Sequence, residues 1–295
     1  MIRRPPRSTL DRSSAASDVY KRQIIIAVED ISVSVENYTK ILGFPPTWKG
    51  VHPGQGTENA LFPLENLYVE LLASNGEGPG SDMIKSFIEL NGEGLCGIAL
   101  NTSDIKAARN KLVAEGIDLG NFIEGEGKDK DSGETRTWKN LFLPFSLTRG
   151  LFTFLIQHED GSIPNHKDKF DAAVTRLDHI VINTNDPEGI ISLYGDTFGI
   201  RLALDQTVEQ WGGRMLFFRL NHTTLEVIAK KNDEQPEDSL WGLAWVVTDI
   251  KETYGRLISE GLEVTDVKEG RKPNTLVATV KSNTCNIPTL LIQHL

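Results

Sequence analysis

The feature that most constrains the fold is a short segment that occurs four times in degenerate form. Each copy is an apolar strand that runs into an acidic helix start, and in each an Asp lies seven residues after the position that opens the strand, which is Gln23 in the first copy. Such internal similarity indicates one supersecondary unit used repeatedly. The copies are IIIAVEDI at 24–31, GIALNTSDI at 97–105, HIVINTND at 179–186 and GLAWVVTDI at 242–250, with Asp30, Asp104, Asp186 and Asp249 at the shared position.

The four units group into two larger halves. The strongest evidence is a match without a gap between 96–117 and 241–262, in which Gly, Ala, Asp-Ile-Lys, Leu and Glu-Gly recur in register. Two shorter matches pair YVELLAS at 68–74 with TLEVIAK at 224–230, and FLIQH at 154–158 with LLIQH at 290–294. We therefore predict two tandem domains.

Each unit has a simple physical interpretation. The apolar run, about five residues long, predicts a half-buried or buried strand. The Asp is a typical N-cap, and apolar residues then recur at helical spacing, as in Ile105, Ala108 and Leu112. Gly116 and Gly261 suit a left-handed position after the helix. Three further strands complete most units, in the third at 201–204, 214–220 and 224–228, so the unit is predicted to be βαβββ.

A twice-doubled βαβββ unit resembles the vicinal oxygen chelate superfamily, which includes glyoxalase I, fosfomycin-resistance proteins and extradiol dioxygenases. The resemblance covers roughly residues 24–295, and the first half is most similar to glyoxalase-like domains through 52–72, 131–138 and the FLIQH ending. It implies an α+β fold of four modules in two glyoxalase-like domains. The expected boundaries are 24–165 for domain 1, 166–176 for a linker and 177–295 for domain 2.

Composition and charge narrow the function classes. With 39% hydrophobic residues, the 295-residue chain has enough apolar side chains for two ordinary cores. No run is long enough for a transmembrane helix, and Cys96 and Cys285 lie in different predicted domains, where buried free thiols are expected. The formal charge of -10 would repel a phosphate backbone. We therefore expect a cytoplasmic protein with neither a nucleic acid nor a membrane partner.

The first 23 residues do not fit the repeat pattern. They are rich in Arg and Ser, have no apolar core and stop abruptly inside the first strand motif. Such a leader is compatible with an organelle transit peptide. We favour another interpretation, because the segment resembles translated sequencing-adapter read-through. Residues 1–23 would then be a non-native, disordered leader, and Gln23 would replace a native residue that comparison with His179 indicates to be His.

The resemblance also implies where a metal would be held. Glyoxalase I-like enzymes take one ligand each from strands one, four, five and eight of a domain, typically His or Gln, Glu, His and Glu. The corresponding positions are Gln23, Glu70, Gly97 and Gln157 in domain 1, and His179, Glu226, Gly242 and Gln293 in domain 2. Glycine supplies no side-chain ligand, and a neutral amide replaces the strand-eight carboxylate in both halves. We therefore expect at most a weakly bound divalent metal ion at His179 and Glu226, and rank extradiol dioxygenase chemistry last.

The candidate ligands also have structural interpretations. His179 opens an inner strand and is able to cap it by a side-chain hydrogen bond. Glu70 and Glu226 interrupt apolar strands, where a carboxylate is costly unless it is paired or functional. A solvated face of a curved sheet would remove that cost, so a functional and a structural role both remain open for the two Glu residues.

Strand geometry decides between the glutamines and their His neighbours. Adjacent residues on a strand point to opposite faces, so only one of each pair lines a cleft. The family pattern favours Gln157 and Gln293, which would leave His158 and His294 facing the helices or solvent.

A Gly-rich turn, HPGQGTEN at 52–59, supplies a further cluster of polar residues. His52, Thr57 and Asn59 are either ordinary turn residues or groups presented to a ligand at the mouth of a cleft. Arg136 and Trp138, on a later strand, would add an anion clamp and an apolar wall.

Two function classes remain open. The first is a lyase- or isomerase-type enzyme that acts on a small oxygen-rich metabolite, with Glu70 or Glu226 as general base. The second is a non-catalytic protein of the bleomycin-resistance type that sequesters a small molecule. The missing metal ligands favour the second class, whereas the FLIQH and HPGQGTEN stretches favour the first. The expected partner is a small molecule, and the domains pair either within one chain or across a homodimer.

Overall fold

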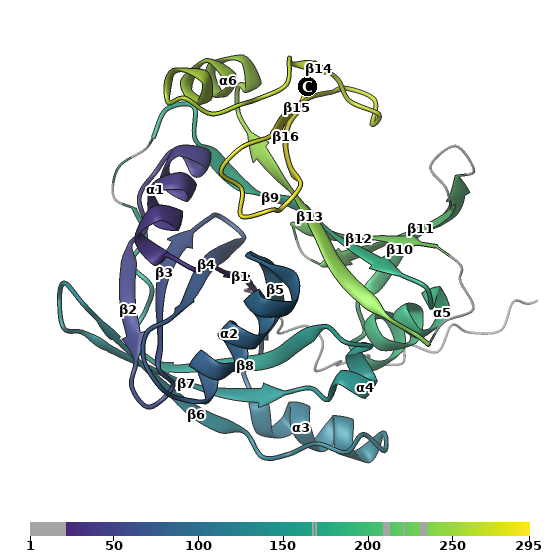
Figure 1. Ribbon diagram of the computed structural model, residues 1–295. Coiled ribbons are helices and arrows are strands. Elements are labelled where there is room, and N and C mark those ends of the chain that lie inside the picture. Colours follow the sequence, from purple (N-terminus) through teal and green to yellow (C-terminus); the bar gives the residue numbers. More distant parts are fainter. Residues whose placement is uncertain (1–21, 167, 169, 209–212, 221, 231–234) are drawn as a thin grey trace, which may run out of the picture.

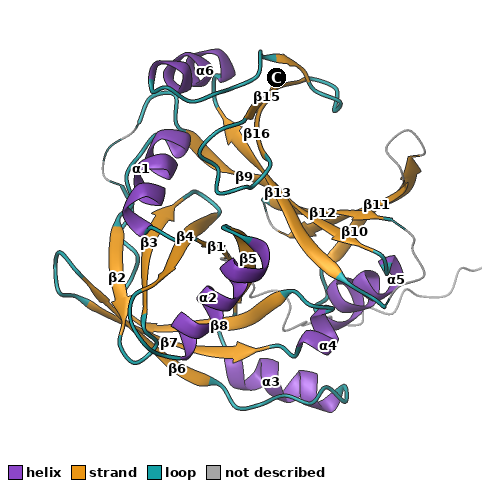
Figure 2. Ribbon diagram, viewed as in Figure 1, coloured by secondary structure: helices purple, strands orange, loops and turns teal. Residues whose placement is uncertain are grey.

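The computed structural model describes residues 22–166, 168, 170–208, 213–220, 222–230 and 235–295. The expectation for the leader lies outside these residues for 1–21, whereas Arg22 and Gln23 already belong to the first strand. The chain forms two lobes, each built on its own β-sheet (Figures 1 and 2).

The first half folds into two βαβββ modules whose strands close into a barrel. The strand order is β1-β4-β3-β2-β6-β7-β8-β5, and the ring closes because β1 pairs with β5 and β2 with β6. The elements are β1 (Arg22–Ala27), α1 (Ile31–Leu42), β2 (Trp48–His52), β3 (Thr57–Pro63), β4 (Leu67–Ser74), α2 (Pro79–Asn91), β5 (Gly94–Asn101), α3 (Ile105–Ala114), β6 (Ile123–Asp129), β7 (Thr135–Phe142), α4 (Phe145–Thr148) and β8 (Phe152–Asp160).

The second half repeats the two modules but its sheet stays open. The strand order is β10-β11-β12-β9-β13-β16-β15-β14, with β10 and β14 at the two edges. The elements are β9 (Val174–Thr184), α5 (Pro187–Ile190), the π-helix η2 (Ile191–Thr197), β10 (Arg201–Val208), β11 (Gly213–Leu220), β12 (Thr223–Ala229), β13 (Asp238–Val247), α6 (Ile250–Ser259), β14 (Lys268–Glu269), β15 (Thr275–Val280) and β16 (Thr289–His294). The predicted α+β fold of tandem βαβββ modules is confirmed.

The repeated Asp caps a helix in all four modules. Its carboxylate accepts hydrogen bonds from backbone N–H groups of the first turn, which would otherwise lack a partner. These caps are Asp30 at α1, Asp104 at α3, Asp186 at α5 and Asp249 at α6. Gly116 and Gly261, with φ of 87° and 82°, follow α3 and α6 in the left-handed conformation predicted for them.

Most of the apolar core lies between the sheets and the helices, and it is continuous across both halves. It includes Ile24 and Ile26 of β1, Leu225 and Val227 of β12 and the fully buried Trp245 of β13. Since neighbouring residues on a strand alternate between faces, the residues between these positions point to the opposite, concave face of each sheet.

A smaller apolar cluster fills part of the barrel interior. It joins Ile25 of β1, Leu72 of β4 and Phe154 of β8 to Ile84 of α2. The linker helix α2 therefore packs against the inner face of the barrel rather than its outside. One side of the barrel is closed in this way, and the remaining interior is available for a ligand.

Polar contacts connect the two halves. Arg149 Nη2 lies 2.6 Å from Asp238 Oδ2, and both side chains are buried. Asn66 Nδ2 donates a hydrogen bond of 2.8 Å to the carbonyl oxygen of Leu177. Together with the shared apolar core, these contacts hold the barrel against the open sheet.

The two cysteines, Cys96 and Cys285, are buried and unbridged, which confirms the predicted free thiols. Burial raises the pKa of the Cys285 thiol to about 11, so this group stays protonated at neutral pH. No helix within the described ranges has both the length and the apolar character needed to span a membrane.

Candidate functional site

The barrel encloses a cavity of about 430 Å³, a size suited to a small organic ligand. Inward-facing residues of the strands form its wall, and Pro79, Gly80 and Met83 at the start of α2 cover one side. The residues predicted from the sequence that line this cavity are Gln23, His52, Thr57, Asn59, Glu70, Arg136 and Trp138.

Glu70 is the buried carboxyl of this cavity. It lies in the middle of β4, is 4% exposed, and its Oε1 accepts a hydrogen bond of 2.6 Å from Asn59 Nδ2 on β3. Burial raises the pKa of Glu70 to about 7, while the hydrogen bond from Asn59 and the charge of Arg136 limit the rise. Glu70 therefore gains and loses a proton near neutral pH, as a general acid or base must.

A directional hydrogen-bond chain runs along the polar end of the cavity. Arg136 Nη2 lies 3.4 Å from His158 Nδ1, and His158 Nε2 lies 3.1 Å from the Tyr68 hydroxyl. That hydroxyl donates a hydrogen bond of 2.9 Å to Gln23 Oε1. Because a guanidinium only donates, the chain assigns the ring hydrogen of His158 to Nε2. Four strands thus fix the position of Arg136.

The guanidinium of Arg136 packs against two tryptophan rings. Its Cζ lies 5.1 Å from the ring centroid of Trp48 and 5.9 Å from that of Trp138. The Trp48 ring lies over Gly50 of its own strand, β2, and the Trp138 ring lies over Gly125 of the neighbouring strand, β6. Glycine is needed at both positions, because a Cβ at Gly50 would collide with Trp48 and one at Gly125 with Trp138. Glycine inside a strand here marks a close approach of a side chain.

His52 stays neutral in this environment. Burial, together with the nearby charge of Arg136, lowers the pKa of His52 to about 4. Its Nδ1 lies 2.8 Å from the Thr57 hydroxyl, and its ring contacts the edge of Trp138 at a centroid distance of 5.6 Å. The predicted polar cluster of the Gly-rich turn therefore lies on the cavity wall, with His52 as a hydrogen-bonding group rather than a cation.

The opposite end of the cavity is aromatic. The ring centroids of Phe142, Phe152 and Phe154 lie 5.2 to 5.7 Å from one another. In the register of β7 against β8, Trp138 pairs with His158 and Phe142 with Phe154. The polar and aromatic groups are therefore separated along the strands, at two ends of one cavity.

The expected orientation of the two glutamines is wrong. Gln157 Oε1 accepts a hydrogen bond of 2.8 Å from the backbone N–H of Ile105, and Gln293 Oε1 one of 2.9 Å from that of Ile250. Each glutamine thus caps a helix on the outer face of its sheet. Because side chains alternate along a strand, His158 points into the cavity instead. The family pattern therefore predicts the wrong face for His158, which belongs to the site.

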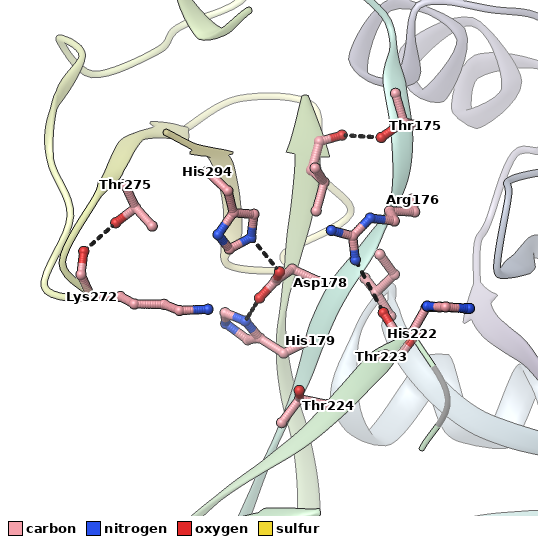
Figure 3. A network of polar contacts seen from close by, with 12 residues as sticks. Thr175, Arg176, Asp178, His179, His222, Thr223, Thr224, Lys272, Thr275 and His294 are labelled. Carbon is pink, nitrogen blue, oxygen red and sulfur yellow. Dashed lines mark hydrogen bonds and ion pairs between the residues drawn. The ribbon is translucent and has the colours of Figure 1, made fainter. Parts of the chain in front are cut away.

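The open sheet carries a separate polar cluster around Asp178 (Figure 3). Asp178 Oδ2 lies 3.0 Å from His179 Nδ1, and Asp178 Oδ1 lies 2.7 Å from His294 Nε2. His179 Nε2 in turn lies 3.6 Å from Glu226 Oε2. Adjacent residues on a regular strand point to opposite faces. Asp178 and His179 nevertheless contact each other, because the register of β9 against β13 shifts at this point.

The charges of this cluster follow from its contacts. Although burial opposes ionisation of Asp178, hydrogen bonds from His179 and His294 together hold its pKa well below the usual range. Burial raises the pKa of Glu226, and the charge of His179 opposes that rise. Asp178 therefore orients two imidazoles, one of which faces a second carboxyl.

The residues of the barrel do not fit the metal that the resemblance implies. Arg136 places a fixed positive charge in the cavity, and Phe152 occupies the space beside Gly97, where a ligand would be needed. Among the described residues of the open sheet, His179 Nε2 and Glu226 Oε2 are the two donor atoms that face each other. Within the part of the chain that the structure describes, no group of three or more His, Cys, Asp or Glu side chains is arranged to hold a metal ion. Two donors are too few for a tight site.

Comparison with known families accounts for both halves. A family model described as "Glyoxalase-like domain" matches residues 24–190, and one described as "Glyoxalase/Bleomycin resistance protein/Dioxygenase superfamily" matches residues 178–279. The chain belongs to the vicinal oxygen chelate superfamily. The resemblance seen in the repeated βαβββ unit is therefore confirmed for this glyoxalase-like protein. No curated protein matches it in sequence.

Solved structures share the whole two-lobed fold. A mutant of 4-hydroxymandelate synthase from Streptomyces coelicolor superposes with a TM-score of 0.66 at 14% identity, covering 94% of this chain and 92% of its own. The Mn(II)-bound glyoxalase from Novosphingobium aromaticivorans gives a TM-score of 0.57 at 13% identity, covering 94% and 82%. A hypothetical protein from Staphylococcus aureus gives 0.60 at 12% identity, covering 93% and 98%. At these identities the likeness establishes the fold alone.

Proposed function

We propose that this glyoxalase-like protein is an enzyme that binds a small oxygen-containing molecule inside the barrel and uses Glu70 as general base. One observation carries the proposal: Glu70 is a buried carboxyl on the cavity wall, and burial raises its pKa to about 7. Glu226, the equivalent residue of the second half, lies on an open sheet and is less suited to the role.

The arrangement supports proton transfer at a carbon next to a carbonyl group. Ionised Glu70 would take that proton, and the electron pair would move onto the carbonyl oxygen. Arg136 supplies a fixed positive charge that stabilises the developing oxyanion. In a hydroxycarbonyl compound, return of the proton to the former carbonyl carbon, with the α-hydroxyl proton moving to the enolate oxygen, completes an isomerisation. Where the β-carbon carries a leaving group, return of the electron pair from the enolate oxygen expels that group and completes a lyase reaction.

A second candidate function is sequestration of the same class of molecule without catalysis. The observation that favours it is the incomplete donor set, since Gly97 and Gly242 occupy the strand-five positions and both glutamines cap helices. A cavity with these polar groups would bind a ligand without any proton transfer.

Hydrogen exchange distinguishes the two functions. The full chain is incubated in deuterium oxide with small 2-oxo and hydroxycarbonyl compounds, and loss of C–H signals is followed by NMR. We expect exchange in wild type and in Glu226→Gln, and none in Glu70→Gln, because the isosteric amide does not accept the proton. Exchange at the wild-type rate in Glu70→Gln would refute the role of Glu70. Binding without exchange in wild type would identify the protein as a binder.

A further inference from the structure

Arg136 is a buried cation without a carboxylate partner among the described residues. It is 5% exposed, lines the cavity, and its Nε has no hydrogen-bond partner. Its neighbours at hydrogen-bonding distance are the imidazole of His158 and the hydroxyl of Tyr68, both uncharged acceptors. A buried charge without a counter-ion is costly, so a negative group of the ligand is expected to provide the missing partner.

A negative group of the ligand would meet the guanidinium of Arg136 along its edge. The two indoles pack over the guanidinium, as the distances to Trp48 and Trp138 show. A guanidinium so held binds a planar carboxylate through two parallel hydrogen bonds along its edge. The glycines beneath the indoles, Gly50 and Gly125, make this arrangement possible.

The charge of the cavity limits the ligand to a single negative charge. Among the described residues that line it, Arg136 is the only Lys or Arg, whereas Glu70, Glu124 and Glu126 are acidic. His52 adds no positive charge, because its pKa is lowered to about 4. A phosphate ester, with nearly two charges at neutral pH, would be poorly compensated here.

The other end of the cavity defines the body of the ligand. Phe142, Phe152 and Phe154 form an aromatic group at the far end of the β7–β8 ladder from Trp138 and His158. Such a surface favours an aromatic or branched apolar group over a sugar or a chain of hydroxyls.

We propose that the ligand of the barrel is a monocarboxylate with an aromatic or apolar body, whose carboxylate pairs with Arg136 and whose body packs against Phe142, Phe152 and Phe154. This rests on the proposed function, since it names the substrate class of the same cavity. Glu70 lies two residues from Tyr68 on β4, which is about 7 Å along a strand. Glu70 therefore lies beside the carbon atoms next to the carboxylate of the ligand.

Calorimetry with matched probes tests the proposal. The full chain is titrated with 4-phenylbutyrate, with the neutral 4-phenylbutyramide, and with phenyl phosphate. We expect wild type to bind the carboxylate about 10- to 100-fold more tightly than the amide, as the loss of a charge-assisted bond predicts. Phenyl phosphate should bind more weakly than the carboxylate. Equal affinity for carboxylate and amide, preference for phenyl phosphate, or no saturable binding of the carboxylate would overturn the proposal.

Substitutions then locate the preference. Arg136→Gln should abolish the preference for the carboxylate, and Arg136→Lys should keep part of it. The control Arg214→Gln, on β11 and outside the cavity, should keep all of it. Phe142→Ser should weaken carboxylate and amide equally. A preference that survives in folded Arg136→Gln, with an unchanged near-ultraviolet spectrum, would refute the assignment. The Glu70→Gln variant distinguishes this proposal from the proposed role of Glu70 as general base. Carboxylate binding should persist in this variant even though proton exchange is lost.

Discussion

Asn59 Nδ2 donates a hydrogen bond of 2.6 Å to Glu70 Oε1 across the neighbouring strands β3 and β4. Both side chains are buried, with exposures of 5% and 4%. Burial favours the neutral carboxylic acid, whereas an amide donor favours the carboxylate. The proton affinity of the site therefore depends on this one hydrogen bond, in balance with the apolar surroundings and the charge of Arg136.

Asn59→Ala should move the pH dependence of proton exchange to higher pH. Without the amide donor the pKa of Glu70 rises above its value of about 7, so a higher pH is needed to ionise the base. The midpoint of the exchange rate against pH measures this directly. Thr57→Ala is the matched control, because Thr57 contacts His52 rather than Glu70. An unchanged midpoint in Asn59→Ala would show that another group limits the reaction.

Glu70→Gln should stabilise the protein at alkaline pH. The pKa of Glu70 is raised from 4.5 to about 7 on folding, so the folded state binds the proton more tightly than the unfolded state. The free energy of unfolding of wild type then falls as pH rises between these values. The variant lacks this dependence and should be more stable by up to about 3 kcal/mol at about pH 8, with little difference at about pH 4. Urea denaturation at both pH values measures it.

The exposed Glu89→Gln on α2 controls for the loss of one negative charge. It should leave the pH dependence of stability as in wild type. If Glu70→Gln and Glu89→Gln behaved alike, the pKa of Glu70 would not be raised in the folded protein.

The sequence repeat predicts the modules because local rules fix them. Each Asp cap and each alternating or buried strand is determined by residues close in the chain, such as Asp104 and Ile105. The faces of β8 and β16 were harder to predict, since buried strands are apolar on both sides and give no alternation. The family's metal ligands predict a site role for the Gln of the repeated Gln-His pair, yet Gln157 and Gln293 recur because both cap helices.

The sequence repeat does not predict the contacts between strands that are distant in the chain. Arg136 comes from β7 and Trp48 from β2, and the barrel brings them together only when β2 pairs with β6. The open second sheet lacks this closure, although its modules share the sequence pattern. Local similarity thus predicts four equivalent modules, whereas the cavity depends on closure in one half.

Arg149→Met should destabilise the folded chain strongly. Arg149 and Asp238 form an ion pair of 2.6 Å across the two halves, with side-chain exposures of 8% and 0%. Removal of the Arg leaves a buried carboxylate without its partner, at a cost of about 3 kcal/mol or more. The double variant Arg149→Met with Asp238→Leu should recover much of the loss, because both charges are then absent. Chemical denaturation of the single and double variants measures both effects, and a single variant as stable as wild type would show that the pair contributes little.

Any divalent metal ion should bind weakly and in the second half. Asp178 accepts from His179 Nδ1 and so leaves His179 Nε2 directed toward Glu226, 3.6 Å away. A carboxylate behind an imidazole favours ligation by the opposite ring nitrogen, but Gly242 adds no donor and Gln293 caps α6. Calorimetric titration with zinc, nickel and manganese should therefore give affinities in the micromolar range or weaker, lost in His179→Ala and kept in His158→Ala. Submicromolar binding that survives His179→Ala would place the metal at other residues.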